Sequence, residues 1–354
     1  MQELTGWSKP GVLPSTLPDC AVIVPTYRRT HEMLRLLNTV VEFANVPAEF
    51  FVIDGSPDDT VNNAIQAWAK GRLLPFRLIY VESPAGLTLQ RNVGIDACER
   101  EFIFFLDDDS VPAPEYFSAI RKVFAEDTKG EVGAIRGFLT NGINKPFTKL
   151  WRLRFALGIV PRGKPGQYHH CGTSGTWDMV APFSGIKEVD VLPGCAAAYR
   201  SEVFSKERFS DFFNGYSQGE DLEMSLRLRM RWRLVVCGDA LVEHREATNG
   251  RPAGFPRGRM AARNRFFIWK RYSPRPGFVN RLRFWMDHVL AISYYGLCFM
   301  IRPWRPYHLA FASGLILGLL ECLVAPPCHH ERAVAREYTF KLDQIGQLPQ
   351  EVFA

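Results

Sequence analysis

The stretch FIFFLDDD, residues 102–109, places three consecutive carboxylates directly after five apolar residues. A short apolar run of this kind is typical of a strand that is buried on both faces of a parallel sheet. Asp107 and Asp109 point the same way on an extended chain, so both can face one site. Neighbouring carboxylates repel one another unless a cation lies among them, and Mg²⁺ or Mn²⁺ is typically held by one or two carboxylates plus a diphosphate. The alternative is a solvated acidic turn ahead of a helix near Pro114.

Three similar apolar runs precede this strand, at residues 20–25, 50–54 and 76–81. Helical patterns separate them: residues 30–43, a segment capped by Asp58 or Asp59, and residues 89–98 capped by Thr88. The alternation predicts an α/β fold with a Rossmann-like, open, mostly parallel sheet and helices on both faces. Ligands of such sheets bind at the carboxyl ends of the strands.

Polar residues follow the first two predicted strands. The first runs into PTYRR, residues 25–29, and the second into Asp54, which is well placed for a sugar hydroxyl or a base N–H. Arg28, Arg29 and Arg91 can neutralise phosphates. Each residue alone also fits an ordinary solvated arginine or an Asp-Gly turn. Their convergence on one sheet edge favours a nucleotide site.

Six segments then occur in an order that matches a known family. They are VIVPTYRR (22–29), VIDGSPDDT (52–60), LTLQRNVGIDA (87–97), FFLDDDSVPAPEYF (104–117), LPGCAAAYRSEVF (192–204) and FSDFFNGYSQGEDLEMSLRLR (209–229). On these segments the chain resembles the family 2 glycosyltransferases, over residues 20–270. The resemblance implies the GT-A fold and a nucleotide-diphosphate sugar as donor.

The resemblance also implies roles on the donor side. Asp109 would be the direct metal ligand, Asp107 would lie nearer the ribose, and His244 would be a further ligand of Mn²⁺ or Mg²⁺. A structural histidine is the alternative for His244. The donor-binding residues would be Pro25, Thr26, Tyr27, Arg28, Asp54, Arg91, Asp107 and Asp108.

On the acceptor side, the resemblance makes Glu220 and Asp221 an acidic pair at a helix start, with Asp221 the catalytic base. A carboxylate that removes the acceptor proton opposite the metal implies direct displacement and inversion. The alternative is that both acids only complement the helix dipole. Gly194 and Cys195 would let a substrate approach the backbone, or would simply pack tightly. Glu223 is expected to be a surface partner for Arg227.

Two features depart from this pattern. Residues 131–189 are expected to form loops, and their aromatic residues fit either an acceptor-binding region or a satellite core. The family's processive synthases carry a QxxRW signature, whereas Arg231-Trp232-Arg233 lacks the glutamine. This favours transfer of one sugar at a time.

The C-terminal part has a different composition. Residues 245–283 hold eleven Lys and Arg against one acid, and residues 284–300 and 308–324 are strongly apolar. Both apolar segments fall short of the ~20 residues that a spanning helix needs. Basic and apolar residues side by side favour helices that lie on a membrane surface, with core helices or an inserted hairpin as alternatives. The expected organisation is an extension at 1–19, a catalytic domain at 20–272 and a helical region at 273–354.

Composition limits the remaining possibilities. With 47% apolar and 23% charged residues, the chain is neither disordered nor fibrous. Its eight cysteines include no CxxC pair, and Cys322, Cys328, His329 and His330 lack the spacing of a metal site. Residues 1–18 contain no apolar signal segment, so we expect a cytoplasmic protein at the inner face of the cell membrane.

Other functions are weaker hypotheses. A sugar nucleotidyltransferase needs a glycine-rich loop after the first strand, which PTYRRT lacks. An inactive scaffold of a glycan assembly complex does not explain why the chain has both the acidic motif at 107–109 and the acidic pair at 220–221. Nucleic-acid binding is not expected because acids line the predicted cleft. The acceptor is expected to be a glycan or a lipid-linked molecule, and UDP-, dTDP- and GDP-sugars all remain possible donors.

Overall fold

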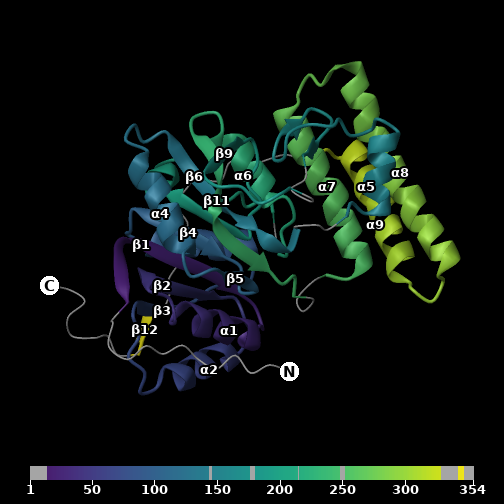
Figure 1. Cartoon of the computed structure of the whole chain (residues 1–354). Helices are drawn as coiled ribbons and strands as arrows, with labels where there is room; N and C mark the ends of the chain where they lie inside the picture. Colours follow the sequence, from purple (N-terminus) through teal and green to yellow (C-terminus); the bar gives the residue numbers. More distant parts are fainter. Residues whose placement is uncertain are drawn as a thin grey trace.

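The computed structural model describes residues 14–142, 146–175, 180–213, 215–247, 252–327 and 342–346. A large mixed sheet with helices on both faces forms one part of the molecule, and three long helices stand beside it (Figure 1). The prediction of an α/β fold is confirmed.

The first half of the sheet follows the predicted alternation. Its elements are β1 (Ser15–Thr26), α1 (Thr30–Val40), β2 (Asn45–Asp54), α2 (Thr60–Ala69), β3 (Arg77–Glu82), α3 (Leu87–Ala97) and β4 (Phe102–Leu106). Strands β3, β2, β1 and β4 are neighbours in this order and are all parallel. Every residue of β4 is buried, as its apolar sequence predicts.

The second half of the sheet is mixed. It contains β5 (Ser110–Pro112), α4 (Tyr116–Glu126), β6 (Val132–Leu139), η1 (Thr140–Gly142), α5 (Lys149–Ala156), β7 (Tyr168–His169), β8 (Thr173–Ser174), β9 (Ile186–Val189), β10 (Ala196–Arg200), η2 (Ser201–Ser205), α6 (Glu220–Leu228) and β11 (Arg233–His244). The full order is β12-β3-β2-β1-β4-β10-β6-β11-β5, where β12 is Leu342–Ile345, and β9 pairs with β11. The short pair β7-β8 forms a separate sheet.

Two apolar cores fill the space between the sheet and its helices. Side chains of α1, α2 and α4 cover one face, where Phe104 and Val52 point toward them. Side chains of α3 and α6 cover the other face, where Phe105 and Ile53 point. Alternate residues of β4 and β2 therefore serve opposite cores, which explains why these strands are apolar at nearly every position.

Three local predictions were wrong. Residues 131–189 are not only loops, because Val132–Leu139 forms the parallel partner of β11; Gly133, Arg136 and Gly137 interrupt its apolar pattern. Thr88 does not cap α3, because the helix begins at Leu87 and the Thr88 hydroxyl instead donates to the Phe213 carbonyl at 2.8 Å.

The third wrong prediction concerns the environment of Glu223. This residue does pair with Arg227 at 2.9 Å, but its side chain is only 2% exposed rather than on the surface. The Tyr272 hydroxyl donates to its other oxygen at 2.6 Å, so Glu223 joins α6 to the helix that contains Tyr272.

The three long helices are α7 (Gly254–Tyr272), α8 (Gly277–Ile301) and α9 (Tyr307–Val324). The last two contain the predicted apolar segments. The expectation that both are too short to span was wrong, because α8 has 25 residues and α9 has 18, and both are long and apolar enough to cross a membrane by length and composition. Residues 328–330, which include the Cys-His-His run, lie outside the described residues.

Candidate active site

A cavity of about 690 Å³ opens at the carboxyl ends of β1 and β4. Its walls come from the segments that follow β1 and β4, from α3, and from the residues before β10 and α6, with the ends of β11 and α7 completing them. This is the sheet edge at which the sequence predicts a ligand site.

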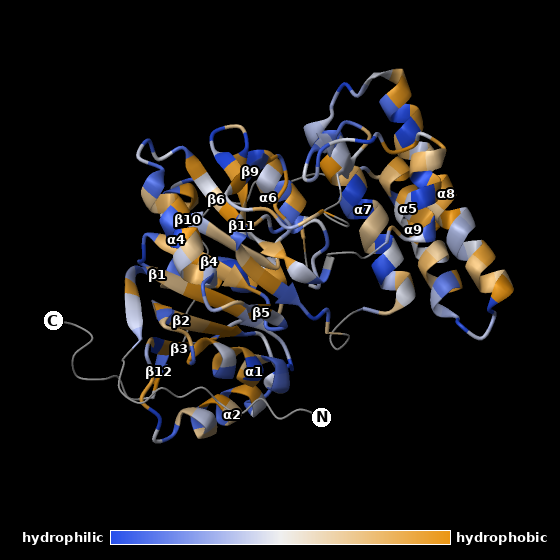
Figure 2. Ribbon diagram, in the orientation of Figure 1, coloured by the Kyte–Doolittle hydropathy of each residue, from blue (hydrophilic) through white to orange (hydrophobic). Residues whose placement is uncertain are grey.

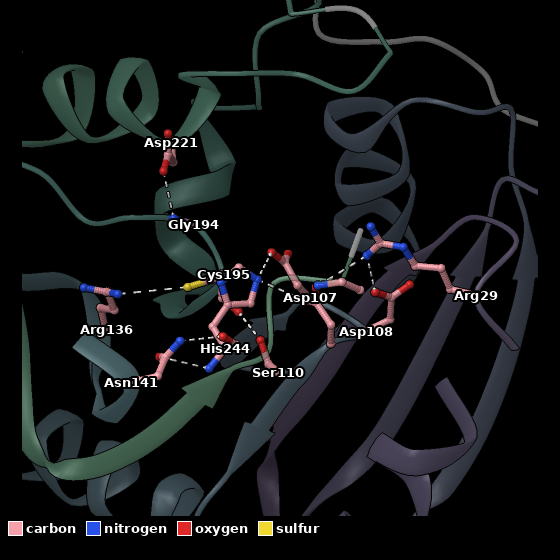
Figure 3. Close-up of polar contacts among 12 residues, drawn as sticks. Arg29, Asp107, Asp108, Ser110, Arg136, Asn141, Gly194, Cys195, Asp221 and His244 are labelled. Carbon is pink, nitrogen blue, oxygen red and sulfur yellow. Dashed lines mark hydrogen bonds and ion pairs between the residues drawn. The ribbon is translucent and has the colours of Figure 1, made fainter. Parts of the chain in front are cut away.

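Asp107, Asp109 and His244 form one group at the edge of the cavity. Figure 3 shows Asp107 beside His244. One potential ligand atom of each lies within 4.8 Å of the other two. The His244 Nε2 atom is 3.0 Å from a carboxylate oxygen of Asp109 and 3.7 Å from one of Asp107. Two carboxylates and an imidazole can bind Mn²⁺ or Mg²⁺.

Pairing between β5 and β11 brings His244 to this position. His244 lies opposite Ser110, the residue after Asp109. Further contacts join the two segments, because the Asp109 carbonyl accepts from the Arg245 N–H at 3.0 Å and its Oδ2 accepts from the Ala247 N–H at 2.7 Å. The backbone therefore fixes the distance between the histidine and the carboxylates.

Asp109 is almost fully buried, at 3% exposure, and yet its Oδ1 atom accepts no hydrogen bond from any described residue. Burial favours the neutral acid, but the adjacent His244 imidazole and the Ala247 N–H outweigh it and lower the pKa of Asp109. A buried carboxylate oxygen that accepts no hydrogen bond and lies 3.0 Å from an imidazole nitrogen fits a divalent cation bound by both atoms as adjacent ligands.

Asp108 turns away from this group toward the first strand. Its two oxygens accept from the Thr26 hydroxyl at 2.9 Å and from the Arg29 guanidinium at 2.8 Å. Burial raises the pKa of Asp108 to about 7, although Arg29 and Thr26 partly offset this effect. These contacts join the segment after β4 to the segment after β1.

Arg91 lies between the two acidic motifs. Its side chain is 2% exposed, and its guanidinium contacts Glu220 at 3.1 Å, Asp107 at 3.3 Å and the Gly194 carbonyl at 3.3 Å. With these partners, Arg91 is a structural link between β4, the segment before β10, and α6. The sequence predicts a residue that lines the nucleotide pocket, and Arg91 does line the cavity.

Glu220 and Asp221 begin α6 and both line the cavity. The Gly194 N–H donates to Asp221 Oδ2 at 2.9 Å (Figure 3). The Leu222 N–H donates to Oδ1 at 2.8 Å. Glu220 is buried, and desolvation, reinforced by the charge of Asp221, raises its pKa to about 8 despite Arg91. Backbone donors thus orient Asp221, whereas Glu220 faces Arg91.

The Gly194-Cys195 backbone joins the two halves of the site. The Cys195 carbonyl accepts from the Asp107 N–H at 3.1 Å and from the Ser110 hydroxyl at 2.9 Å. A Cβ atom on Gly194 would lie 3.1 Å from the Asp221 Cβ and 3.3 Å from Arg91. Glycine therefore allows Asp221 to approach the backbone here.

Two predicted donor-binding residues lie away from the main cavity. Arg28 is exposed and does not line it, and its neighbour Arg29 does. Asp54 lies in an adjacent hollow of about 330 Å³, where it accepts from the Tyr80 hydroxyl at 2.7 Å and the Ser56 N–H at 2.8 Å. Pro25, Thr26 and Tyr27 line the main cavity as predicted.

Other cavity residues were not singled out from the sequence. The Gln90 amide donates to the carbonyls of Thr26 and Ile53, at 2.8 and 2.7 Å, and so joins the ends of β1 and β2. Arg257 reaches the cavity from α7, far along the chain. Nothing local in the sequence distinguishes either residue from its neighbours.

Two solved structures are similar to this chain in fold. A mannosyltransferase from Pyrobaculum calidifontis, solved with GDP-Man and Mn²⁺, is 15% identical, with a TM-score of 0.51 over 86% of this chain and 87% of that chain. GalNAc-T7, solved with UDP, GalNAc and Mn²⁺, is 13% identical, with a TM-score of 0.52 over 88% of this chain and 58% of that chain. These similarities show the fold, which is GT-A. A search of curated proteins finds no match.

The comparison with protein families shows the family as well as the fold. The model "Glycosyl transferase family 2" matches residues 21–206. This region is more than half of the 354 residues and includes the second half of β1 and all of β2 through β10, with the DDD motif and the Gly194-Cys195 backbone. The chain belongs to glycosyl transferase family 2 and is a glycosyltransferase.

Proposed function

We propose that this enzyme moves one sugar, with inversion, from a nucleotide-diphosphate sugar to an acceptor hydroxyl. The observation that carries the proposal is that a metal-ligating group and an acidic pair line one cavity and are joined by Arg91. This arrangement provides separate groups for the leaving diphosphate and for the attacking hydroxyl.

Asp107, Asp109 and His244 would hold the divalent cation. The unpaired buried oxygen of Asp109 is the observation that supports the fit. When bound, Mn²⁺ or Mg²⁺ would stabilise the negative charge that develops on the leaving nucleoside diphosphate. Asp108 and Arg29 keep the segment that contains these ligands against β1.

Asp221 acts as the catalytic base. Its carboxylate accepts the proton of the acceptor hydroxyl, whose oxygen attacks the anomeric carbon as the bond to the diphosphate breaks. The Gly194 N–H orients the carboxylate at the cavity wall. Attack from the side opposite the leaving group inverts the anomeric configuration.

Thr26, Tyr27 and Pro25 contact the nucleotide, and Asp54, in the adjacent hollow, meets the base or ribose. The ligands named for the two similar structures, GDP-Man and UDP with GalNAc, support a nucleotide-diphosphate sugar as the donor class. A donor screen identifies the sugar and the base of this enzyme's donor.

The acceptor is a glycan or lipid-linked molecule used in cell-surface polysaccharide or glycolipid synthesis, and the enzyme works at the cytoplasmic face of the membrane. The two apolar helices beside the catalytic domain support this location. We place the domain boundary at residues 272–273, between α7 and α8. Nucleic acid is not a partner.

A donor screen tests the proposal. The purified chain is incubated with UDP-, GDP- and dTDP-sugars, with Mn²⁺ or with a chelator, and released nucleoside diphosphate is measured. Slow release from one donor, lost on chelation, is the expected result. If no donor is hydrolysed and no nucleoside diphosphate binds in the presence of metal, the chain is an inactive scaffold.

A further inference from the structure

Helix α8 exposes an apolar stripe along its whole length. The positions of these exposed side chains follow the 3.6-residue repeat of the helix, so they lie on one face. They are Phe278, Val279, Leu282, Met286, Val289, Leu297, Met300 and Ile301. Figure 2 shows hydrophobic residues over much of α8 and α9. An exposed apolar surface of this length is unusual for a soluble protein and indicates a binding surface.

Helix α9 continues this surface. Its exposed apolar residues are Leu309, Ile316, Leu317, Leu320, Leu323 and Val324. Trp304, in the turn between the two helices, is 72% exposed. We name these exposed residues of α8, α9 and their connecting turn the apolar face.

The opposite side of α9 is held tightly against α7. A Cβ atom on Gly258 of α7 would lie 2.1 Å from the Phe311 carbonyl oxygen, and one on Gly314 of α9 would lie 2.2 Å from the Phe255 carbonyl oxygen. The two backbones are therefore in direct contact, and an ion pair between Arg259 and Glu321 adds a polar link at 2.7 Å. Because α7 contains several arginines, α9 cannot enter a bilayer core without either breaking this packing or burying charge.

Buried charges also fix the orientation of α8. Asp287, at 1% exposure, pairs with Arg154 of α5 at 2.6 Å and with Arg265 of α7. These partners hold one face of α8 against the protein and leave the apolar face outward. A spanning helix would have to carry this ionic cluster into the hydrocarbon layer.

Positive charge surrounds the apolar face. Arg275 and Arg281 lie near the start of α8, and Arg302 and Arg305 lie in the turn that leads to α9; all four are exposed. No carboxylate pairs with any of them in the described part of the chain. The only acids in residues 252–327 are Asp287 and Glu321, and both are already paired.

From these observations we infer that the apolar face lies in the plane of one leaflet of a membrane that contains anionic lipids, and that neither helix crosses the bilayer. The apolar side chains enter the acyl region, while the four arginines contact lipid phosphates. This inference deepens the proposed membrane location and rests on it.

The same helices connect the membrane to the cavity. Arg257, near the start of α7, lines the cavity and donates to the hydroxyl of Tyr307, the first residue of α9, at 3.4 Å. A leaflet bound by α9 therefore lies near the part of the cavity wall that contains Arg257, which favours a lipid-linked acceptor over a free glycan.

Vesicle flotation of the full-length chain tests the inference. Vesicles of phosphatidylcholine alone are compared with vesicles that also contain phosphatidylglycerol. Wild-type protein should float with the anionic vesicles and be released by alkaline carbonate. V289E/L297E should bind roughly tenfold more weakly or worse, and the Arg281→Gln/Arg302→Gln/Arg305→Gln variant should lose about fivefold per arginine on anionic vesicles.

The control is L73E/M230E. Leu73 and Met230 are 68% and 76% exposed, more than Val289 and Leu297, and they lie outside α7, α8 and α9. This variant should float like the wild type. Equal flotation of V289E/L297E and wild type, or no flotation of the wild type, would overturn the inference. Resistance to carbonate would indicate a spanning hairpin, and a dimer that dissociates in V289E/L297E would make the face an interface between copies; either result also contradicts it.

Donor hydrolysis without lipid is measured on the same samples. V289E/L297E should retain the wild-type rate, which shows that its catalytic domain is folded. If the wild type floats but hydrolyses no donor, the proposed function fails while the membrane inference stands.

Discussion

Asp221→Asn is expected to lower kcat by about 10²- to 10⁴-fold, the usual contribution of a general base. Asparagine keeps the shape and can still accept from the Gly194 N–H, but it cannot take a proton from the acceptor. KM for the donor should change little, because Asp221 is not among the metal-ligating side chains. Steady-state release of nucleoside diphosphate measures both constants.

The matched control is Asp239→Asn, which changes an exposed aspartate of β11 outside the cavity. It should leave kcat unchanged. If Asp221→Asn keeps a rate close to that of the wild type, the base is a different residue, and the same change in Glu220 becomes the next test.

Arg91→Met is expected to reduce the free energy of unfolding by about 3–5 kcal/mol, because it removes the buried guanidinium partner of buried Glu220 and half-buried Asp107. Glu220 and Asp107 both lose a partner, and the link between the two acidic motifs is broken. Metal-dependent turnover should be lost as well. Urea denaturation followed by circular dichroism gives the stability change.

Two comparisons separate this interpretation from simple loss of packing. R233M removes an arginine that is paired with Glu188 at 3.1 Å and is 43% exposed, so it should cost less than about 1 kcal/mol. Glu220→Gln in the Arg91→Met background should recover part of the stability, because a neutral amide replaces the buried carboxyl group that has lost its guanidinium partner. If Arg91→Met lowers the free energy of unfolding only slightly and Glu220→Gln restores none of it, Arg91 does not hold the two acidic motifs together.

Most of the site residues could be predicted because strand ends are local features. The buried run of β4 ends at Asp107, and β11 ends at His244, so both fall at an edge that the sheet order fixes. What sequence could not predict is which of two adjacent side chains faces inward. Arg28 adopts a positive φ of 54°, and it is Arg29 that pairs with Asp108.

Long-range contacts account for the remaining differences. Val132–Leu139 becomes a strand because β11 and β10 lie on either side of it, a pairing that its glycines and Arg136 conceal in the sequence. Glu223 follows a surface-like spacing to Arg227 but is buried by Tyr272 of α7. In both cases the partner lies far along the chain, where periodicity gives no information.

The most direct test of the central claim is Mn²⁺ binding in the presence of a nucleoside diphosphate, measured by titration calorimetry on the wild type and on Asp109→Asn. UDP and GDP are each used as the probe. The account predicts that the wild type binds Mn²⁺ with one of them and that Asp109→Asn weakens this binding by roughly 10- to 100-fold or more. Equal Mn²⁺ affinity in the two proteins would contradict the metal site and, with it, the proposed mechanism.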